Sequence, residues 1–257
     1  MKQYIAFTKK EFTESLRTYK FLIMTVVFLI FGIMSPLTAK FTPEILKAAG
    51  LDPSAAAALG LGEPTMIDSW AQFFKNTGQL GLLVAAIVFS GIMANEFTKG
   101  TLINMLTKGL NRGTVVLAKL TAAVTVWTLA YLLCLGTCRG YTAYYFEPVG
   151  LSNVFFSFFS LWLFGVLLIA LLVFGGVAFK GILGSLLTAG GTVAVLSLIN
   201  IVPKIQKFNP ATLSGAGMAL LTGQKALADV LPATILCGVL ILLLAGASIW
   251  VFRKKQV

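Results

Sequence analysis

Long apolar runs separated by short polar stretches dominate the chain. A transmembrane helix needs about 20 consecutive, mostly apolar residues. Six runs approach or reach this length, at about residues 21–39, 78–94, 114–138, 154–179, 182–202 and 231–252. The fourth and fifth runs together are too long for one helix, which predicts a hairpin that turns at Phe179–Gly181. The pattern predicts an all-α membrane protein with six transmembrane helices.

The stretch before the first run has helical periodicity but is too polar to span. At about 100° per residue, four apolar side chains fall on one face. They are Ile5, Phe12, Leu16 and Tyr19. The opposite side carries Lys10, Glu11, Glu14 and Arg17. We predict that residues 1–20 form an amphipathic helix in the cytoplasmic membrane interface, with a solvated leader as the alternative.

Two longer segments separate the runs on the other side of the membrane. Lys40–Thr77 ends in "MIDSWAQFFK", whose Trp70, Phe73 and Phe74 suit an aromatic belt at the membrane surface. Pro203–Val230 is too polar to span and too apolar for open water. We expect short helices on or dipping into the outer leaflet there.

Composition supports one membrane domain that uses the full length, residues 1–257. The chain is 58% hydrophobic and 11% charged, whereas soluble domains are about a quarter charged. Its 20 Lys plus Arg against 9 Asp plus Glu give a net charge of +11. We interpret this excess as basic loops held in the cytoplasm, with both termini inside, because most basic residues then lie inside. No basic stripe with interleaved aromatic residues indicates nucleic-acid binding.

Several kinds of catalytic site are missing from the sequence. The chain has no histidine, which excludes Ser-His-Asp and Cys-His catalysis and histidine metal sites. It also has no G-x-x-x-x-G-K-[ST] motif, so it carries no P-loop ATPase of its own. Cys134 and Cys138 lie one helical turn apart, but no other ligand is near them, so we interpret all three cysteines as small buried residues. We assign no catalytic, cofactor-binding or metal-binding residue.

The polar stretch between the second and third runs reads "NEFTKGTLINMLTKGLNR", at residues 95–112. Glu96 is the only acid between Asp68 and Glu147. Thr101–Lys108 can form two helical turns that stop at Gly109. Its apolar residues are Leu102, Ile103, Met105 and Leu106. A short, half-apolar cytoplasmic helix can rest on the membrane or sit in a groove on a partner; a plain loop is the alternative.

This stretch resembles the first cytoplasmic loop in permease subunits of ABC-2-type transporters. Those loops commonly read E-x-x-x-G-T, then a few apolar residues, then Pro-x-Ser-Arg. This chain keeps Glu96, Gly100-Thr101 and Arg112, but it has "GLNR" where the family often has Pro-x-Ser-Arg. The resemblance extends to the whole plan of amphipathic leader, six spans and outer helices between spans five and six.

The resemblance implies a permease subunit of an exporter in the cytoplasmic (plasma) membrane of a bacterium. Such a permease pairs with a second copy or a paralogue, and both rest on separate cytoplasmic ATPase subunits that bind ATP and Mg. It further implies that the loop forms a coupling helix seated on the ATPase. The residues expected to couple are Glu96, Gly100, Thr101, Leu102, Met105, Leu106 and Arg112. Glu96 is expected to pair with a basic group of the loop or the ATPase, and Arg112 to anchor the third span at the headgroups.

Two other functions fit a polytopic membrane protein. A secondary transporter or channel usually places ionisable residues at mid-membrane depth, and no acid lies within the six runs. A lipid-modifying enzyme needs clustered acids, histidines or a nucleophile at the interface, and the acids here are sparse. The apolar spans are compatible with lipid-like, peptide or drug cargo, and the sequence does not distinguish among these three classes.

Overall fold

The computed structural model describes residues 2–48, 63–98 and 109–255, together with Gly50, Gly100 and Thr107. Within these residues every regular element is a helix. Six of the helices are long and apolar enough to cross a membrane, which confirms the predicted fold class. They are Lys20–Ile45, Met66–Thr98, Arg112–Tyr145, Val154–Phe179, Ile182–Ile199 and Leu227–Lys254.

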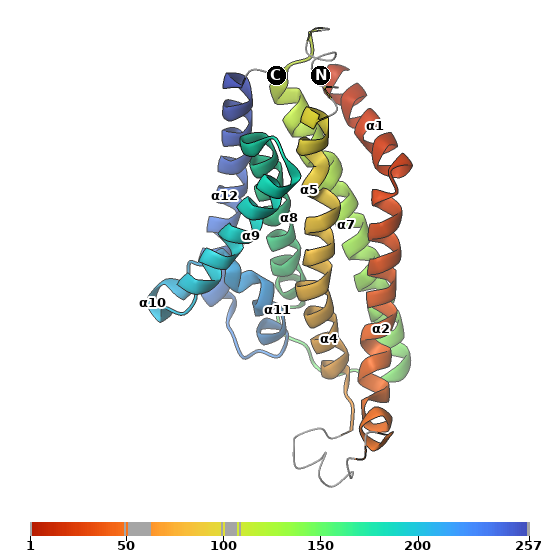
Figure 1. Cartoon of the computed structure of the whole chain (residues 1–257). Helices are drawn as coiled ribbons and strands as arrows, with labels where there is room; N and C mark the ends of the chain where they lie inside the picture. The colour runs from red at the N-terminus through yellow and green to blue at the C-terminus, as the bar shows by residue number, and fades with distance from the viewer. Residues whose placement is uncertain are drawn as a thin grey trace.

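The helices run up and down through one elongated bundle (Figure 1). In chain order they are α1 (Lys2–Arg17), α2 (Lys20–Ala48), α4 (Met66–Lys75), η1 (Asn76–Gly81), α5 (Leu82–Thr98), α7 (Arg112–Tyr145), α8 (Val154–Phe179), α9 (Ile182–Ile199), α10 (Pro203–Gln206), η2 (Pro210–Thr212), α11 (Leu213–Leu221) and α12 (Leu227–Lys254). Both chain termini lie at one end of the bundle, which we call the terminal end. The short helices α10 and α11 lie towards the opposite, distal end.

Helix α8 forms the centre of the bundle. It packs against α5, α9, α11 and α12, and most of its residues are buried. Helix α2 packs along α7, and α1 packs on α7 near the terminal end. In contrast, α9 and α12 leave most of their apolar side chains at least partly exposed, as helices that face lipid do.

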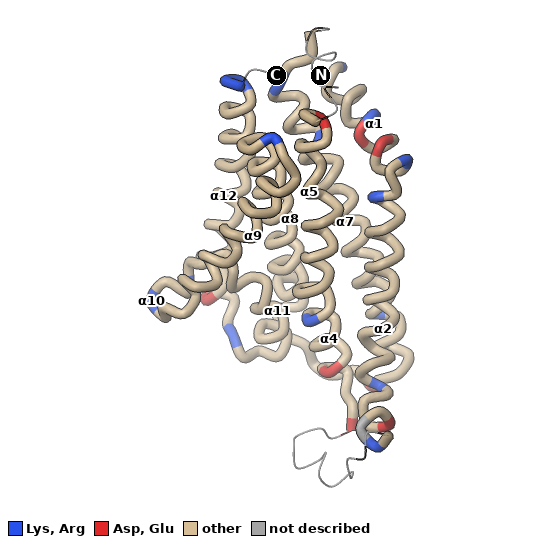
Figure 2. Tube along the Cα trace, in the orientation of Figure 1, with Lys and Arg blue, Asp and Glu red and all other residues tan. Residues whose placement is uncertain are grey.

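Charged residues gather mainly towards the two ends of the bundle, and the long middle of the helices is almost free of them (Figure 2). This distribution fits a hydrocarbon layer across the middle, because an unpaired charge there is costly.

The second span starts earlier than its apolar run suggests. Helix α4, the π-helical turn η1 and α5 form one continuous helix of 33 residues. Asp68 starts it by accepting hydrogen bonds from the backbone N–H and hydroxyl of Thr65, both at 2.8 Å. The predicted aromatic belt is therefore wrong, because Trp70, Phe73 and Phe74 are buried in the core. Their rings pack against Phe158 of α8 with centroids 5.0 to 5.6 Å apart.

The predicted hairpin turn lies where expected, between α8 and α9. Its left-handed residue is Lys180, with φ 55°, and not the glycine beside it. Gly181 has an extended backbone and precedes the first residue of α9.

Helices α7 and α8 approach closely at Gly165. A Cβ atom at this position would lie 2.2 Å from Cζ2 of Trp127. The Trp127 ring is held in place, because its Nε1 donates to the carbonyl of Trp162 at 3.1 Å and the ring makes a T-shaped contact with Phe28. The absence of a side chain at Gly165 therefore sets the spacing of the two helices.

We expect Gly165→Ala to lower the free energy of unfolding by about 1–3 kcal/mol, because Trp127 has to leave its position. Gly136→Ala on α7 is the matched control, since nothing lies within 4 Å of a Cβ there. That change should be neutral or stabilise by about 0.5–1 kcal/mol, because alanine favours helix over glycine. Unfolding in detergent micelles titrated with SDS measures both; equal effects of the two variants would contradict the close approach.

Candidate functional site

Helix α1 turns one polar face towards the bundle. Phe7, Glu11 and Ser15 are its buried residues, and Phe12 packs against the core while partly buried. The other apolar residues of the predicted face point outward, with Ile5 65% exposed and Leu16 and Tyr19 similarly so. Contact of these three with the membrane stays a prediction. Glu11, which the periodicity placed opposite the apolar face, is buried between helices.

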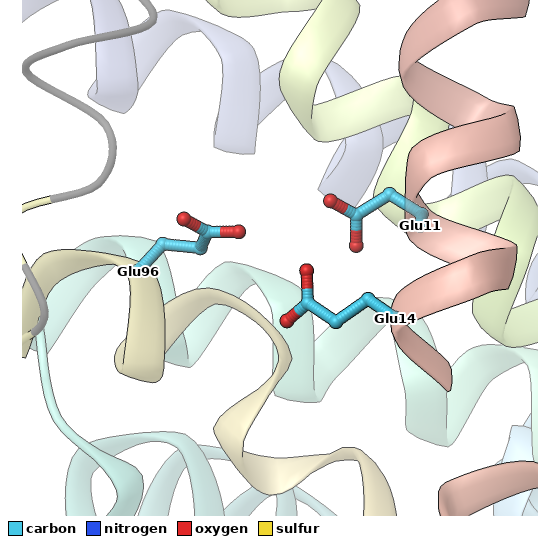
Figure 3. Close-up of side chains that lie close together, drawn as sticks. All are labelled: Glu11, Glu14 and Glu96. Carbon is cyan, nitrogen blue, oxygen red and sulfur yellow. The ribbon is translucent and has the colours of Figure 1, made fainter. Parts of the chain in front are cut away.

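Three carboxylates and two ammonium groups meet where α1 lies beside α5 and α7. We call this the charge cluster; it consists of Lys10, Glu11, Glu14, Glu96 and Lys119. The carboxylates of Glu11 and Glu14 on α1 and Glu96 on α5 point towards one another (Figure 3), with one oxygen from each within 4.8 Å of the others. Five side chains from three helices therefore share one site.

Lys119 of α7 lies at the buried side of the cluster. Its Nζ is 2.9 Å from Oε2 of Glu11 and 2.9 Å from Oε1 of Glu96, and the residue is only 1% exposed. Glu11 and Glu96 are 5% and 4% exposed. Burial of such charges is tolerated only with close partners, and removing one partner of a buried pair costs about 3–5 kcal/mol.

Lys10 closes the cluster on its more open side. Its Nζ lies 3.0 Å from Glu11, 2.6 Å from Glu14 and 2.9 Å from Glu96. Partial burial lowers the pKa of Lys10, but its hydrogen bonds to Glu14 and Glu96 outweigh this and hold that pKa above the usual value. Burial likewise raises the pKa of Glu14, and the Lys10 contact outweighs it and holds that pKa below the usual value. Both groups are therefore charged at neutral pH.

Three carboxylates this close together could also bind a metal ion, and here two ammonium groups contact them. Each Nζ contacts at least two carboxylates at 3.0 Å or less. The chain thus neutralises its buried acids with its own lysines. The charge cluster links α1, α5 and α7 at one point, so movement of one of these helices can be passed to the other two.

The loop that follows Glu96 is described only at its ends. Helix α5 ends at Thr98, and Gly100 has φ +64°, a left-handed conformation that favours glycine. Four predicted coupling residues, Thr101, Leu102, Met105 and Leu106, lie outside the described residues.

Arg112 begins α7 and contacts the end of another helix. Its Nη1 donates to the carbonyls of Phe252 at 2.6 Å, Arg253 at 3.1 Å and Lys255 at 2.6 Å. A guanidinium suits this position, because the last carbonyls of a helix lack partners and carry partial negative charge. Arg112 thus joins the start of the third span to the end of α12, in addition to any anchoring at headgroups.

Sequence reasoning selected Glu96 but missed its partners. Two ion-pair partners among the described residues are Lys10 on α1 and Lys119 on α7. A usable signal was present for Lys119, which lies inside the third apolar run; charges within such runs usually have a partner or a function. No pattern along the chain paired Lys119 with Glu11, since the two are 108 positions apart.

Comparison with known proteins agrees with this architecture. The family model described as ABC-2 family transporter protein matches residues 5–257. The chain belongs to the ABC-2 transporter family. It is also similar to the uncharacterized transmembrane protein YxlG of Bacillus subtilis (strain 168), with 26% identity over 269 residues that cover 100% of this chain and 99% of that protein.

Membership of the ABC-2 family fits the helices described above. The chain is a multi-pass membrane protein and a membrane subunit of the permease kind, and such subunits are generally not catalytic themselves. In this ABC-2 protein the charge cluster therefore lies in a transport subunit, at the terminal end, beside the loop between the second and third spans.

We expect Lys119→Met to destabilise this ABC-2 protein by about 3 kcal/mol, the lower end of the range for a broken buried pair, because Lys10 still contacts both acids. The double variant Glu11→Gln with Lys119→Met should cost less than the sum of the two single changes. Unfolding in SDS-titrated micelles gives each value, and strict additivity would contradict a direct interaction.

Lys207→Met provides the control. Lys207 lies 3.9 Å from Asp229, and both side chains are about half exposed. Surface pairs of this kind contribute about 0–1 kcal/mol. A similar loss in Lys207→Met and Lys119→Met would show that burial of the cluster does not matter.

Proposed function

We propose that the chain is the permease subunit of an ATP-binding cassette exporter, driven by a separate cytoplasmic ATPase. The observation that supports this proposal most directly is the charge cluster. The cluster joins the leader helix α1 to α5 and to α7, which follows the loop. Its α5 residue, Glu96, lies two residues before α5 ends at Thr98. A push on the loop is thereby passed to three helices at once.

The proposed mechanism is rigid-body coupling. ATP and Mg bind to the ATPase subunits and not to this chain. Closure of the ATPase dimer displaces the helix predicted from sequence at residues 101–108, and the cluster carries α1, α5 and α7 along. Arg112 extends the connection to α12 through the carbonyls of Phe252 and Lys255. Transport follows if nucleotide and cargo each prefer one of the two arrangements of these helices.

The assembly that this mechanism needs contains two permeases, either two copies of this chain or a pair of paralogues. Its expected place is the bacterial plasma membrane with both termini in the cytoplasm. The two termini, the end of α5 and the start of α7 lie at one end of the bundle, which supports this orientation (Figure 1). The basic excess of the chain supports it as well.

An ATP-independent transporter is the competing function. Such a protein places its coupling charges near mid-membrane. Here the buried acid Glu96 lies instead two residues before the end of α5, and Glu11 lies on α1, which precedes the first span. Uptake driven by membrane potential in liposomes that contain only this protein would favour the competing function.

We expect the purified protein to bind an ABC ATPase subunit in equal number when the two are co-expressed, and to stimulate its ATP hydrolysis in proteoliposomes. Leu106→Asp should abolish binding, because it places a charge on the apolar face expected to enter the ATPase groove. Ile205→Asp is the control, since Ile205 is exposed on α10 at the distal end. Stimulation by Leu106→Asp equal to that of the wild type would remove the loop helix from the mechanism.

We also expect Glu96→Gln to keep membrane insertion and ATPase binding but to lose most of the stimulation. An amide accepts a weaker hydrogen bond from Lys10 and Lys119 than a carboxylate does, so α5 is held less firmly. Glu147→Gln, an exposed acid beyond the end of α7, should leave stimulation unchanged. Chemical-denaturation and ATPase measurements on the same preparations separate lost coupling from lost folding.

A further inference from the structure

A large apolar cavity lies between α4, α7 and α8, in the distal half of the bundle. Its volume is about 820 Å³, within the range of small-molecule sites. Aromatic side chains dominate its lining. Those that matter here are Trp70, Tyr131, Phe155, Phe158 and Trp162, together with one cation, Arg139.

The floor of this cavity offers little to a polar ligand. The hydroxyl of Tyr131 donates to the carbonyl of Phe158 at 2.8 Å, and Nε1 of Trp162 donates to the hydroxyl of Thr128 at 3.0 Å. Thr128 in turn donates to the carbonyl of Val124 at 2.7 Å. These polar groups are satisfied by the protein, whereas Nε1 of Trp70, which also lines the cavity, has no hydrogen-bond partner among the described residues. The rest of the lining is mainly apolar, which suits a hydrocarbon chain.

The cavity opens towards the surroundings of the bundle. Phe155 at its rim is 70% exposed, and Leu132 and Val154 are exposed beside it. Arg139 is exposed too, and among residues 2–48, 63–98 and 109–255 no carboxylate lies within 4.0 Å of it. An opening lined by apolar residues, with a guanidinium free to bind an anion, has the character of an amphiphile site.

The dimensions match one leaflet of a bilayer. Along α7, Thr128 and Arg139 are about 16 Å apart at 1.5 Å per residue. Half of the hydrocarbon core is about 15 Å thick. Tyr141 and Tyr144 are exposed just beyond Arg139, and exposed tyrosines of this kind mark the headgroup level. Arg139 therefore lies at headgroup depth when Thr128 lies near the middle of the membrane.

We propose that the cavity binds one membrane phospholipid with a negatively charged headgroup. An acyl chain fills the space against Tyr131, Phe158 and Trp162, and the phosphate contacts the Arg139 guanidinium. Arginine matches phosphate well, because its planar fork donates two parallel hydrogen bonds. Choice of an anionic lipid follows because Arg139 has no carboxylate partner among the described residues to neutralise it. The site requires neither export nor an ATPase.

Tryptophan fluorescence tests the proposal, because Trp70 and Trp162 line the cavity. The background variant Trp250→Phe removes the exposed tryptophan of α12, which bulk lipid would quench. The protein is placed in phosphatidylcholine vesicles that contain a small fraction of brominated phosphatidylglycerol or brominated phosphatidylcholine. We expect the phosphatidylglycerol to quench at a concentration on the order of fivefold lower, since an exposed charge-assisted contact is modest.

Arg139→Gln should abolish this preference, and Arg139→Lys should retain part of it, because an ammonium keeps the charge but not the fork. Lys40→Gln is the control, an exposed cation in the half of α2 that is farther from α1 along the chain. Mass spectrometry of lipid retained after detergent washing gives a second measure, and it should show an anionic phospholipid in the wild type and its loss in Arg139→Gln. Equal quenching by the two lipids, or an unchanged preference in Arg139→Gln, would overturn the proposal.

Discussion

Two lysines hold three glutamates together at the terminal end of this bundle, and the position of α1 depends on that contact. Much of the rest of the described chain is joined by apolar packing. Lys119 contacts both Glu11 and Glu96, so it fixes α1 and α5 against α7 at the same point. Buried charges are tolerated only in such a paired arrangement, and their requirement for partners makes the geometry specific.

The placement of this cluster gives the ABC-2 protein two different ends. At the terminal end, polar contacts join helices across the bundle, including those of Arg112 with the last carbonyls of α12. At the distal end, aromatic rings of α4 and α8 pack tightly, and the helices leave an apolar cavity beside them. A force applied at the first end would reach the second through α5, α7 and α8, which extend between the two.

The sequence predicted the fold well because lipid imposes a simple rule. Every backbone polar group must be satisfied within its own segment, so an apolar run of sufficient length becomes a helix. The hairpin at Phe179–Gly181 followed from length alone. The sequence did not show that Trp70, Phe73 and Phe74 are buried in the core. A cluster of aromatic residues at a helix end has the same sequence pattern whether it contacts lipid or another helix, and here it contacts Phe158 of α8.

The candidate site was predicted only in part, for a related reason. Glu96 was conspicuous as a single acid in a long basic and apolar stretch. Its partners come from positions far away in the chain, Lys10 and Lys119, and their pairing depends on how α1 rotates about its axis. Periodicity placed Glu11 opposite the apolar face of α1, and the structure shows that the surface it meets there is protein. Whether the polar side of α1 meets solvent or other helices depends on tertiary packing, which local sequence patterns do not show.

The π-helical turn η1 in the second span has a consequence for the whole helix. A wider turn takes up residues without adding a regular α-helical turn, and each residue corresponds to about 100° of rotation. The aromatic face of α4 and the Glu96 face of α5 are therefore set relative to each other by Asn76–Gly81. If this segment were a regular α-helix, the aromatic face of α4 would be rotated relative to the Glu96 face of α5. The π-helical turn therefore allows both faces to contact their neighbouring helices.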